Sequence, residues 1–191
     1  NPFLFSDTMA QVVFISGTPT VGKTTISEKI ADDLNANLIK INDLAIENGF
    51  VLGIEEEKGY KVIDIDKLDD KLQEVLNSFS DDELVIVEGH LSHLCSNPDC
   101  VIILRAHPKL LKERLASRNY SQAKINENLE AEALGVCAVE AFELHGDKVN
   151  ELDVTDLAID EIADIIKDII SGKNSYPVGN VDFMDWIVEN S

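Results

Sequence analysis

The sequence predicts an α/β fold in which helices cover both faces of a five-stranded parallel sheet. Short apolar runs, typical of buried strands, alternate along the chain with stretches in which apolar residues recur at helical spacing. Between the first strand and the first helix lies a complete G-x-x-x-x-G-K-T segment, Gly17-Thr18-Pro19-Thr20-Val21-Gly22-Lys23-Thr24. A strand, a glycine-rich loop and a helix in this order are the context that a phosphate-binding loop requires.

The alternation of elements can be followed from one end of the chain to the other. Strands are expected near 11–16, 38–41, 84–88, 100–104 and 149–153. Helices are expected near 23–35, 66–79, 108–118, 121–145 and 156–171. Because the strands are apolar and are separated by helices, the sheet should be parallel and buried on both faces.

The helices are expected from their apolar spacing and their end signals. In the first helix, Ile26, Ile30 and Leu34 lie at i, i+4 and i+8. Pro108 suits the first position of the third helix, and Gly172 can cap the last. The other residues expected to face the core are Leu68, Leu72, Val75 and Phe79 in the second helix, Leu110, Leu111 and Leu115 in the third, and Ile162, Ile165 or Ile166, and Ile169 in the last.

The glycine-rich loop predicts a site for the phosphates of ATP. Its glycines let the backbone wrap closely around phosphate oxygens, and the helix that follows adds free N–H groups and a positive dipole end. Lys23 should reach the β- and γ-phosphates, the Thr24 hydroxyl should ligate Mg²⁺, and Thr25 should lie near the α-phosphate. The predicted ATP-binding residues of this segment are Gly17, Thr18, Pro19, Thr20, Val21, Gly22, Lys23, Thr24 and Thr25.

All three arginines of the chain, Arg105, Arg114 and Arg118, fall within fourteen residues. Arg114 and Arg118 are i, i+4 neighbours in the expected helix, so both can point at one target. Phosphoryl transfer needs fixed cations where negative charge spreads over the transferring group, which makes both arginines catalytic candidates. The alternative is a solvated basic helix end.

A second phosphate-site signal lies in the run 84–90, where an apolar strand ends in Glu88-Gly89-His90. Glu88 should hold a Mg²⁺-bound water, because Mg²⁺ keeps several waters and takes few protein ligands. His90 lies two residues further on and could orient a phosphate or a water. His93 is interpreted as a bystander.

Length and composition indicate one domain with a sizeable core, because the chain has 191 residues and 45% hydrophobic residues. We see no apolar run of 18 residues and no secretory signal, so we expect no membrane association. The three cysteines, Cys95, Cys100 and Cys137, lack C-x-x-C spacing. They favour a reducing, cytoplasmic location over a zinc site.

The formal net charge of −20 argues against autonomous binding to nucleic acid, which needs clustered Lys and Arg. The acidic residues are spread along the chain, for example in 55–57, 64–70, 81–83 and 153–168. Solubility explains such a surface, and a basic protein partner is the sharper alternative.

Several segments stand apart from the alternating pattern. Residues 1–8 are interpreted as a cloning remnant, with Met9 as the natural start and 9–191 as one domain. Residues 42–65 are expected to form a small mobile insert. Residues 173–191 are expected to form a tail that carries Trp186 and docks on the body.

Together these features resemble the short adenylate kinase-like proteins related to the nuclear coilin-interacting adenylate kinase and to its archaeal ribosome-maturation homologues. The resemblance covers about residues 10–190. Besides the glycine-rich loop with Thr25, it is carried by Ile41-Asn42-Asp43-Leu44-Ala45, Asp64-Ile65-Asp66, Glu88-Gly89-His90, Leu104-Arg105, Glu113-Arg114-Leu115 through Arg118-Asn119-Tyr120, Glu127-Asn128-Leu129-Glu130-Ala131-Glu132, and Val181-Asp182-Phe183-Met184-Asp185-Trp186.

The resemblance implies an AMP-binding insert at about 42–65 and a short lid at about 116–126. It assigns Arg105 and Arg114 to ATP binding, with Arg114 stacked on the adenine, and places Arg118 near the phosphates. It implies reversible Mg²⁺-dependent transfer between ATP and AMP with some ATPase activity. It also implies a role in small ribosomal subunit maturation through a ribosomal protein with a basic tail.

Two residues depart from the family pattern. Thr20 stands where the family usually has glycine, which affects the shape of the loop. Ile46 stands where eukaryotic relatives carry an arginine suited to the AMP phosphate, so AMP capture would rest on backbone donors, Lys40 and the lid arginines. Two alternatives stay open: an ATP-driven ribosome assembly factor with incidental kinase activity, and a small-metabolite kinase.

Overall fold

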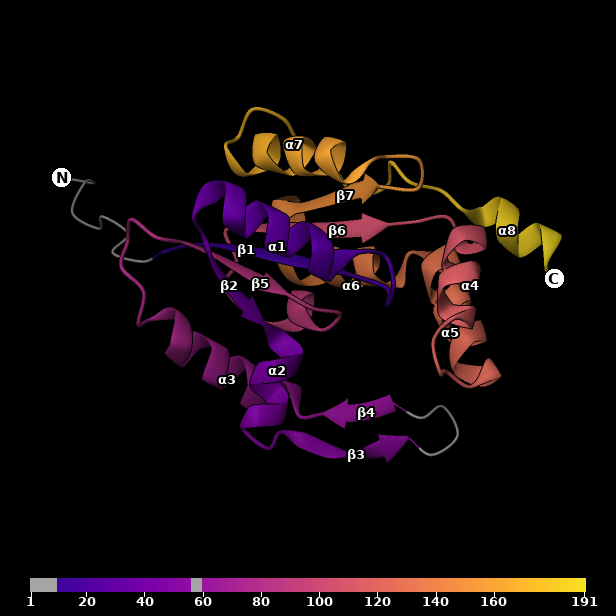
Figure 1. The fold of residues 1–191 in the computed structure, drawn as a ribbon, viewed down its shortest axis with the longest axis horizontal. Coiled ribbons are helices and arrows are strands. Elements are labelled where there is room, and N and C mark those ends of the chain that lie inside the picture. Colours follow the sequence, from indigo (N-terminus) through magenta and orange to yellow (C-terminus); the bar gives the residue numbers. More distant parts are fainter. Residues whose placement is uncertain (1–9, 56–59) are drawn as a thin grey trace.

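The computed structural model describes residues 10–55 and 60–191 (Figure 1). The interpretation of residues 1–8 and of Met9 falls outside this range. Five parallel strands form the central sheet in the order β2-β5-β1-β6-β7. They are β1 (Gln11–Gly17), β2 (Asn37–Lys40), β5 (Leu84–Glu88), β6 (Cys100–Arg105) and β7 (Val149–Asp153). The predicted five-stranded parallel sheet is confirmed, with strand bounds close to those expected.

Side chains from alternate positions of the strands enter two separate hydrophobic clusters. Val13 and Ile15 of β1 face the cluster that α1 (Lys23–Leu34) and α7 (Ile159–Ile170) cover. Val12 and Phe14 face the other cluster, which α3 (Ile65–Leu76) and α6 (Val136–His145) cover. The strands read as continuous apolar runs because both faces of the sheet are buried.

The long helix predicted for 121–145 is instead two helices, α5 (Gln122–Leu134) and α6. The break lies at Gly135, which has a left-handed backbone with φ 68. A Cβ atom at this position would lie 3.2 Å from Arg105 Nη1. The change of direction therefore lets the chain pass a buried guanidinium, a constraint that helical periodicity does not reveal.

Two helix faces also differ in detail from the predicted ones. In α3 the buried positions are Leu68, Leu72 and Leu76, while Val75 is only partly covered. The helix ends at Leu76, so Phe79, which is also partly covered, lies beyond it. In α1 the predicted core residue Leu34 is 37% exposed, because the helix ends there. The predicted helices at 108–118 and 156–171 are α4 (Pro108–Ala116) and α7, and Gly172 follows α7 with φ 77.

The insert at 42–65 contains elements that the sequence pattern did not indicate. A short helix α2 (Ile41–Glu47) leads into a hairpin of β3 (Val51–Glu55) and β4 (Tyr60–Ile63). The hairpin extends away from the central sheet, on the same side as α2 (Figure 1). The 3₁₀ turns η1 (Ser92–Leu94) and η2 (Gly146–Lys148) were likewise not expected. Every helix among residues 10–55 and 60–191 is too short or too polar to traverse a lipid bilayer.

The tail at 173–191 packs along β7 and ends in α8 (Met184–Glu189) beside α5 (Figure 1). The Tyr176 carbonyl accepts from the Glu151 backbone N–H at 2.8 Å, and Asn150 pairs with Pro177. Phe183 is 5% exposed, and Trp186 packs against the cluster under α1 and α7. The tail therefore docks on the body of the protein, as expected.

The position of the glycine-rich loop depends on a close approach between β1 and β6. At Gly17, φ is 148 and a Cβ atom would lie 2.6 Å from the Leu104 carbonyl oxygen and 3.0 Å from Val21 Cγ1. Neither neighbour can move easily, because one is backbone of a central strand and the other is a buried side chain of the loop. Only glycine fits at the point where β1 turns into the loop.

We expect Gly17→Ala to lower the free energy of unfolding by about 3 kcal/mol or more, because the added methyl group meets fixed backbone in a strained conformation. Gly49→Ala is the matched control. Gly49 also has a positive φ of 72, but no atom of the described residues lies within 4 Å of its added Cβ. The control should cost about 1 kcal/mol. Urea unfolding measures both, and equal losses would contradict the close-approach explanation.

Candidate functional site

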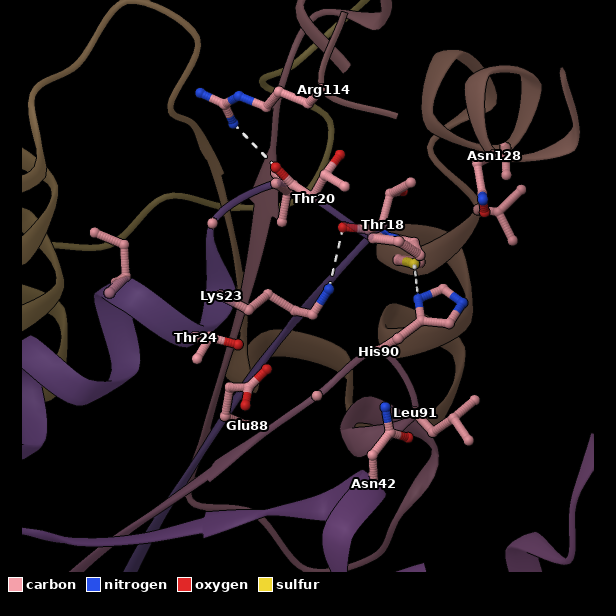
Figure 2. A pocket seen from close by; sticks show the side chains of 18 of the residues that line it. Thr18, Thr20, Lys23, Thr24, Asn42, Glu88, His90, Leu91, Arg114 and Asn128 are labelled. Atoms are coloured by element: carbon pink, nitrogen blue, oxygen red, sulfur yellow. Dashed lines mark hydrogen bonds between the residues drawn. The ribbon is translucent and has the colours of Figure 1, made fainter. Parts of the chain in front are cut away.

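A cleft of about 1190 Å³ opens at the carboxyl ends of the central strands, between the glycine-rich loop, the insert and α5 (Figure 2). Parallel α/β sheets place ligand sites at this edge. The predicted site residues that line it are Thr18, Pro19, Thr20, Val21, Gly22, Lys23, Thr24, Thr25, Glu88, His90, Arg114 and Arg118. The cleft therefore brings together residues that are 100 positions apart in the sequence.

Lys23 is the buried cation of this cleft, with an exposed fraction of 9%. Its Nζ atom donates to the carbonyl oxygens of Gly17 at 2.9 Å and Thr18 at 3.1 Å. Burial lowers the pKa of Lys23 to about 8, although the carboxylate of Glu88 opposes the change. The lysine is thus held at the loop in a form that is still largely protonated at neutral pH.

Thr24 and Glu88 form the oxygen-donor pair of the site. Glu88 ends β5 and is 6% exposed. Burial raises the pKa of its carboxyl group, and Lys23, Lys40 and a hydrogen bond from the Thr24 hydroxyl oppose this effect. A hydroxyl and a carboxylate side by side suit a hard divalent cation such as Mg²⁺, which prefers oxygen ligands. The predicted metal residues therefore lie together and offer suitable donors.

His90 is held in its neutral form. Burial and the nearby ammonium of Lys23 lower the pKa of His90 to about 4. Its Nδ1 atom lies 3.0 Å from the Gly17 carbonyl oxygen. Because a carbonyl oxygen can only accept, Nδ1 carries the proton and Nε2 is left as an acceptor. A neutral acceptor suits a water better than an anionic phosphate. Of the two roles expected for His90, the orientation of a water is therefore favoured over the orientation of a phosphate.

The two predicted catalytic arginines both line the cleft, but they do not share a helix. Arg114 lies in the last turn of α4, and its Nη1 donates to the Thr20 carbonyl oxygen at 3.0 Å. Because α4 ends at Ala116, Arg118 lies in the turn that follows. The helical i, i+4 argument is therefore wrong for this pair, although both cations do reach one cleft.

Thr20 has an unusual backbone conformation, with φ 70 in a β-branched residue. Its hydroxyl is buried and has no hydrogen-bond partner among the described residues. Asn128 of α5 presents a second such group, its Nδ2 atom. Both residues line the cleft. Buried donors without partners are uncommon in native structures, and a bound ligand can satisfy them.

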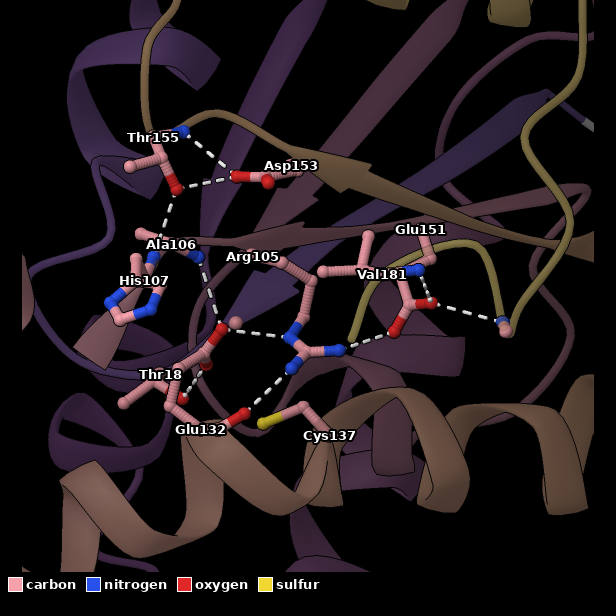
Figure 3. Close-up of polar contacts among 12 residues, drawn as sticks. Thr18, Arg105, Ala106, His107, Glu132, Cys137, Glu151, Asp153, Thr155 and Val181 are labelled. Atoms are coloured by element: carbon pink, nitrogen blue, oxygen red, sulfur yellow. Dashed lines mark hydrogen bonds and ion pairs between the residues drawn. The ribbon is translucent and has the colours of Figure 1, made fainter. Parts of the chain in front are cut away.

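Arg105, which was predicted to bind ATP, is not among the described residues that line the cleft. It is 2% exposed, and its guanidinium lies between the carboxylates of Glu132 and Glu151 (Figure 3). Burial disfavours the cation, but these two carboxylates outweigh it and raise the pKa of Arg105. The arginine is taken up by a buried ion-pair network, a placement that differs from the predicted contact with nucleotide.

Glu132 was quoted only as part of a family motif, and no role was given to it. A signal was nevertheless present, because Ile125, Leu129, Glu132 and Ala133 form one buried stripe of α5. An acidic residue in an apolar stripe indicates a buried partner of opposite charge.

The side of the cleft next to the insert also differs from expectation. Lys40, which was considered for AMP capture, pairs with Glu28 at 2.8 Å and is not among the described residues of the cleft wall. Lys61 of β4 does line the cleft, together with Asn42 and Ile46. Lys61 was missed because the hairpin that carries it was not predicted.

His93, Cys137 and Glu140 are the one group of potential metal ligands found among the described residues, with ligand atoms within 4.8 Å of one another. His93 Nδ1 lies 2.7 Å from Ser16 Oγ, and its Nε2 lies 3.4 Å from Glu140 Oε1. These contacts satisfy both ring nitrogens without an ion. Burial raises the pKa of the Cys137 thiol to about 12, so the sulfur is a neutral core group.

Comparison with known proteins places these features in context. A family model described as an AAA domain matches residues 13–135. A protein of Methanothermobacter thermautotrophicus named "Putative adenylate kinase" is 46% identical over 177 residues, which cover 93% of this chain and 99% of the relative. A protein of the same name from Thermococcus gammatolerans is 39% identical and covers 91% of this chain and 93% of the relative.

Solved structures share the fold at much lower identity. The thymidylate kinase of Candida albicans superimposes with a TM-score of 0.59 at 14% identity, over 88% of this chain and 94% of that one. This likeness confirms the α/β phosphate-loop kinase fold expected from the sequence. At this identity it carries no information on the substrate.

The depressed pKa of Lys23 predicts a pH limit for binding of Mg-ATP. Above about pH 8 the ammonium loses its proton, so the association constant should fall, approaching tenfold per pH unit. Calorimetric titration between pH 6.5 and 9.5 measures the effect. Lys23→Met, which keeps the stem and removes the charge, should bind weakly and show no such decline. An equal decline in this variant would assign the effect to another group.

Proposed function

Because the chain belongs to the phosphate-loop family of these archaeal adenylate kinase homologues, we propose that it transfers the γ-phosphoryl group of ATP to AMP and forms two ADP. The observation that carries the proposal is the cleft that joins the glycine-rich loop and Lys23 to Glu88, His90 and two arginines. The names of the relatives support the adenylate kinase reading.

The phosphates of ATP would occupy the loop in front of Lys23. In the ligand-free protein the ammonium donates to the Gly17 and Thr18 carbonyl oxygens. A bound β- or γ-phosphate would offer it a charged acceptor instead, and charge-assisted hydrogen bonds are the stronger ones. The first N–H groups of α1 have no side-chain cap, because Gly22 is the N-cap residue, and so they remain available to an anion.

Arg114 and Arg118 would supply cations to the cleft in addition to Lys23. Charge spreads over the equatorial oxygens of the transferring phosphoryl group, so fixed positive groups lower the barrier. Arg114 is already oriented by its bond to the Thr20 carbonyl oxygen. We propose that Arg114 contacts ATP and that Arg118 follows the phosphates as the lid at 116–126 closes.

Thr24 and Glu88 would hold Mg²⁺, Thr24 directly and Glu88 through a water of the ion. When bound, this cation neutralises charge on the β- and γ-phosphates. His90, with a neutral Nε2 acceptor, would orient a water near the same phosphates, which supports an accompanying ATPase activity. The buried Thr20 hydroxyl and Asn128 amide are further groups that a nucleotide could satisfy.

AMP would enter from the insert, where Asn42, Ile46 and Lys61 line the cleft. Lys61 of β4 and Arg118 both line the cleft. Ile46 provides an apolar surface that is 49% exposed. Lys61 would take the place expected for Lys40 and bind the AMP phosphate together with the lid arginines.

We expect AMP to be the preferred acceptor in a panel of nucleoside monophosphates, scored by ADP formed and by free phosphate. A small-metabolite kinase would instead transfer phosphate to none of the nucleoside monophosphates. Release of free phosphate with no transfer to a nucleoside monophosphate would favour the assembly-factor alternative.

We expect Glu88→Gln to lower the Mg²⁺-dependent rate by about 10²-fold and to have a smaller effect on ATP affinity, because it removes a charge next to the ion and leaves the loop intact.

The acidic surface supports a second role, assistance in small ribosomal subunit maturation through a basic ribosomal protein. The net charge is −20, and α7 presents exposed acidic groups, Asp160, Glu161, Asp164 and Asp168. Opposite charge raises the rate of encounter and fixes orientation. The resemblance to ribosome-maturation proteins points to a small-subunit protein with a Lys/Arg-rich tail.

We expect the protein to bind such a basic tail and to release it as salt rises, because charge attraction is screened over about 8 Å at physiological ionic strength. Calorimetry of the purified pair across a salt series, with and without nucleotide, measures this. The control is the same tail with its Lys and Arg changed to Gln, which should not bind. Tight binding to naked RNA in place of the protein tail would refute the role.

A further inference from the structure

A buried chain of polar contacts connects the glycine-rich loop with α5 and β6 (Figure 3). The Thr18 hydroxyl donates to Glu132 Oε2 at 2.6 Å. The other carboxylate oxygen, Oε1, accepts from Arg105 Nε at 2.7 Å and from the Ala106 backbone N–H at 3.0 Å. Thr18, Glu132 and Arg105 are each 2% exposed. Water therefore does not compete for these bonds, and their geometry is fixed by the protein.

Arg105 leaves the Glu132 carboxylate little freedom to rotate. Besides the contact through Nε, its Nη2 donates to the Glu132 backbone carbonyl oxygen at 2.6 Å. Its Nη1 donates to Glu151 on β7. The planar guanidinium thus holds both the side chain and the backbone of Glu132, while Glu151 is its second ion-pair partner.

Thr18 in turn governs the position of the catalytic lysine. The carbonyl oxygen of Thr18 accepts from Lys23 Nζ at 3.1 Å and from the Val21 backbone N–H at 3.3 Å. Because the Thr18 side chain is tied to Glu132, the peptide that carries this carbonyl cannot turn freely. The hydroxyl itself is committed to Glu132 and buried, so it is not offered to a bound nucleotide.

The same helix also forms part of the cleft wall. Asn128 and Ala131 of α5 line the cleft, within one turn of Glu132. The start of α5 lies in the predicted lid. Helix α5 therefore contributes to the wall of the cleft and, through Glu132, contacts the glycine-rich loop.

We propose that Glu132 is a positioning residue for phosphoryl transfer, which acts through Thr18 on Lys23 and is itself held in place by Arg105. The proposal rests on the phosphate-transfer function proposed above and names a residue that sets the geometry of that site. This positioning role does not require any group of the network to gain or lose a proton.

The test uses Thr18→Val and Glu132→Gln in the full chain. Thr18→Val removes the one hydroxyl that links loop and helix, keeps the shape of the side chain and leaves the ion pairs of Arg105 in place. We expect kcat to fall about tenfold or more, because a lysine misplaced by a fraction of an ångström stabilises the transferring group less well. The Kd for Mg-ATP should rise less, by about threefold. Glu132→Gln should show the same order of effects.

Glu151→Gln is the matched control, since it removes the other carboxylate from the same guanidinium but touches no atom of the loop. It should lower the melting temperature, as Glu132→Gln does, and leave kcat and Kd within about twofold of the unaltered protein. A purely structural network predicts that Glu151→Gln and Glu132→Gln lose activity alike, and that Thr18→Val loses none. Either result would overturn the proposal.

The same series separates this inference from the proposed function. If the unaltered protein binds Mg-ATP but transfers phosphate to no acceptor, the proposed function fails. The Kd values alone then decide the positioning role, because the loop geometry affects phosphate binding without any acceptor. If Glu132→Gln does not fold, Thr18→Val decides the question.

Discussion

The buried guanidinium of Arg105 connects the glycine-rich loop, α5, β7 and the tail of this protein. Glu132 joins it to α5 and, through Thr18, to the glycine-rich loop. Glu151 joins it to β7 and to the tail, because its Oε1 accepts from the Gly179 backbone N–H at 3.0 Å. Phe183 of the tail lies over the guanidinium, with 5.1 Å from Cζ to the ring centroid. A buried charge that loses a partner is costly, so loop, helix and tail are expected to stay together.

The electrostatics of the cleft differ from those of the whole molecule. The chain is strongly acidic, yet the cleft collects Lys23, Arg114 and Arg118 around the loop. Burial keeps His90 neutral and brings Lys23 close to its titration range. The repulsion that a surface of net charge −20 exerts on a nucleotide is therefore offset locally, where charges are partly shielded from solvent.

The sequence predicted the sheet well because each strand is an apolar run that is buried on both faces. Gly17-Thr18 to Thr24-Thr25 could be recognised for a similar reason, since the whole motif lies in one short stretch of sequence with a fixed spacing of its glycines. The helix of 121–145 was predicted without its break, because the guanidinium that passes Gly135 comes from a residue 30 positions earlier. A contact between residues so far apart in the sequence does not change the periodic spacing of apolar residues from which helices are predicted.

The lack of a local sequence signal also explains why Arg105 was assigned to ATP binding and why Lys61 was missed. Arg105 is the last residue of the apolar strand β6 and lies close in sequence to the two arginines of the cleft, so the sequence suggested a shared role. Its surroundings are instead set by Glu132 and Glu151, which lie on two other elements. Lys61 was missed because the short hairpin β3–β4 has neither a long apolar run nor a tight two-residue turn signal. Local sequence patterns predict helices, strands and short motifs. Which buried charges pair with one another can be seen only in the three-dimensional structure.

The single tryptophan of the chain lies in α8, the part of the tail that packs beside α5. Trp186 is half-buried there, and the hydrogen bond between the Trp186 carbonyl oxygen and Asn190 closes the helix at the end of the chain. Its indole emission therefore comes from one place only, the seam between the tail and the helix that carries Glu132. The protein thus contains its own fluorescent reporter of the contact between the tail and α5.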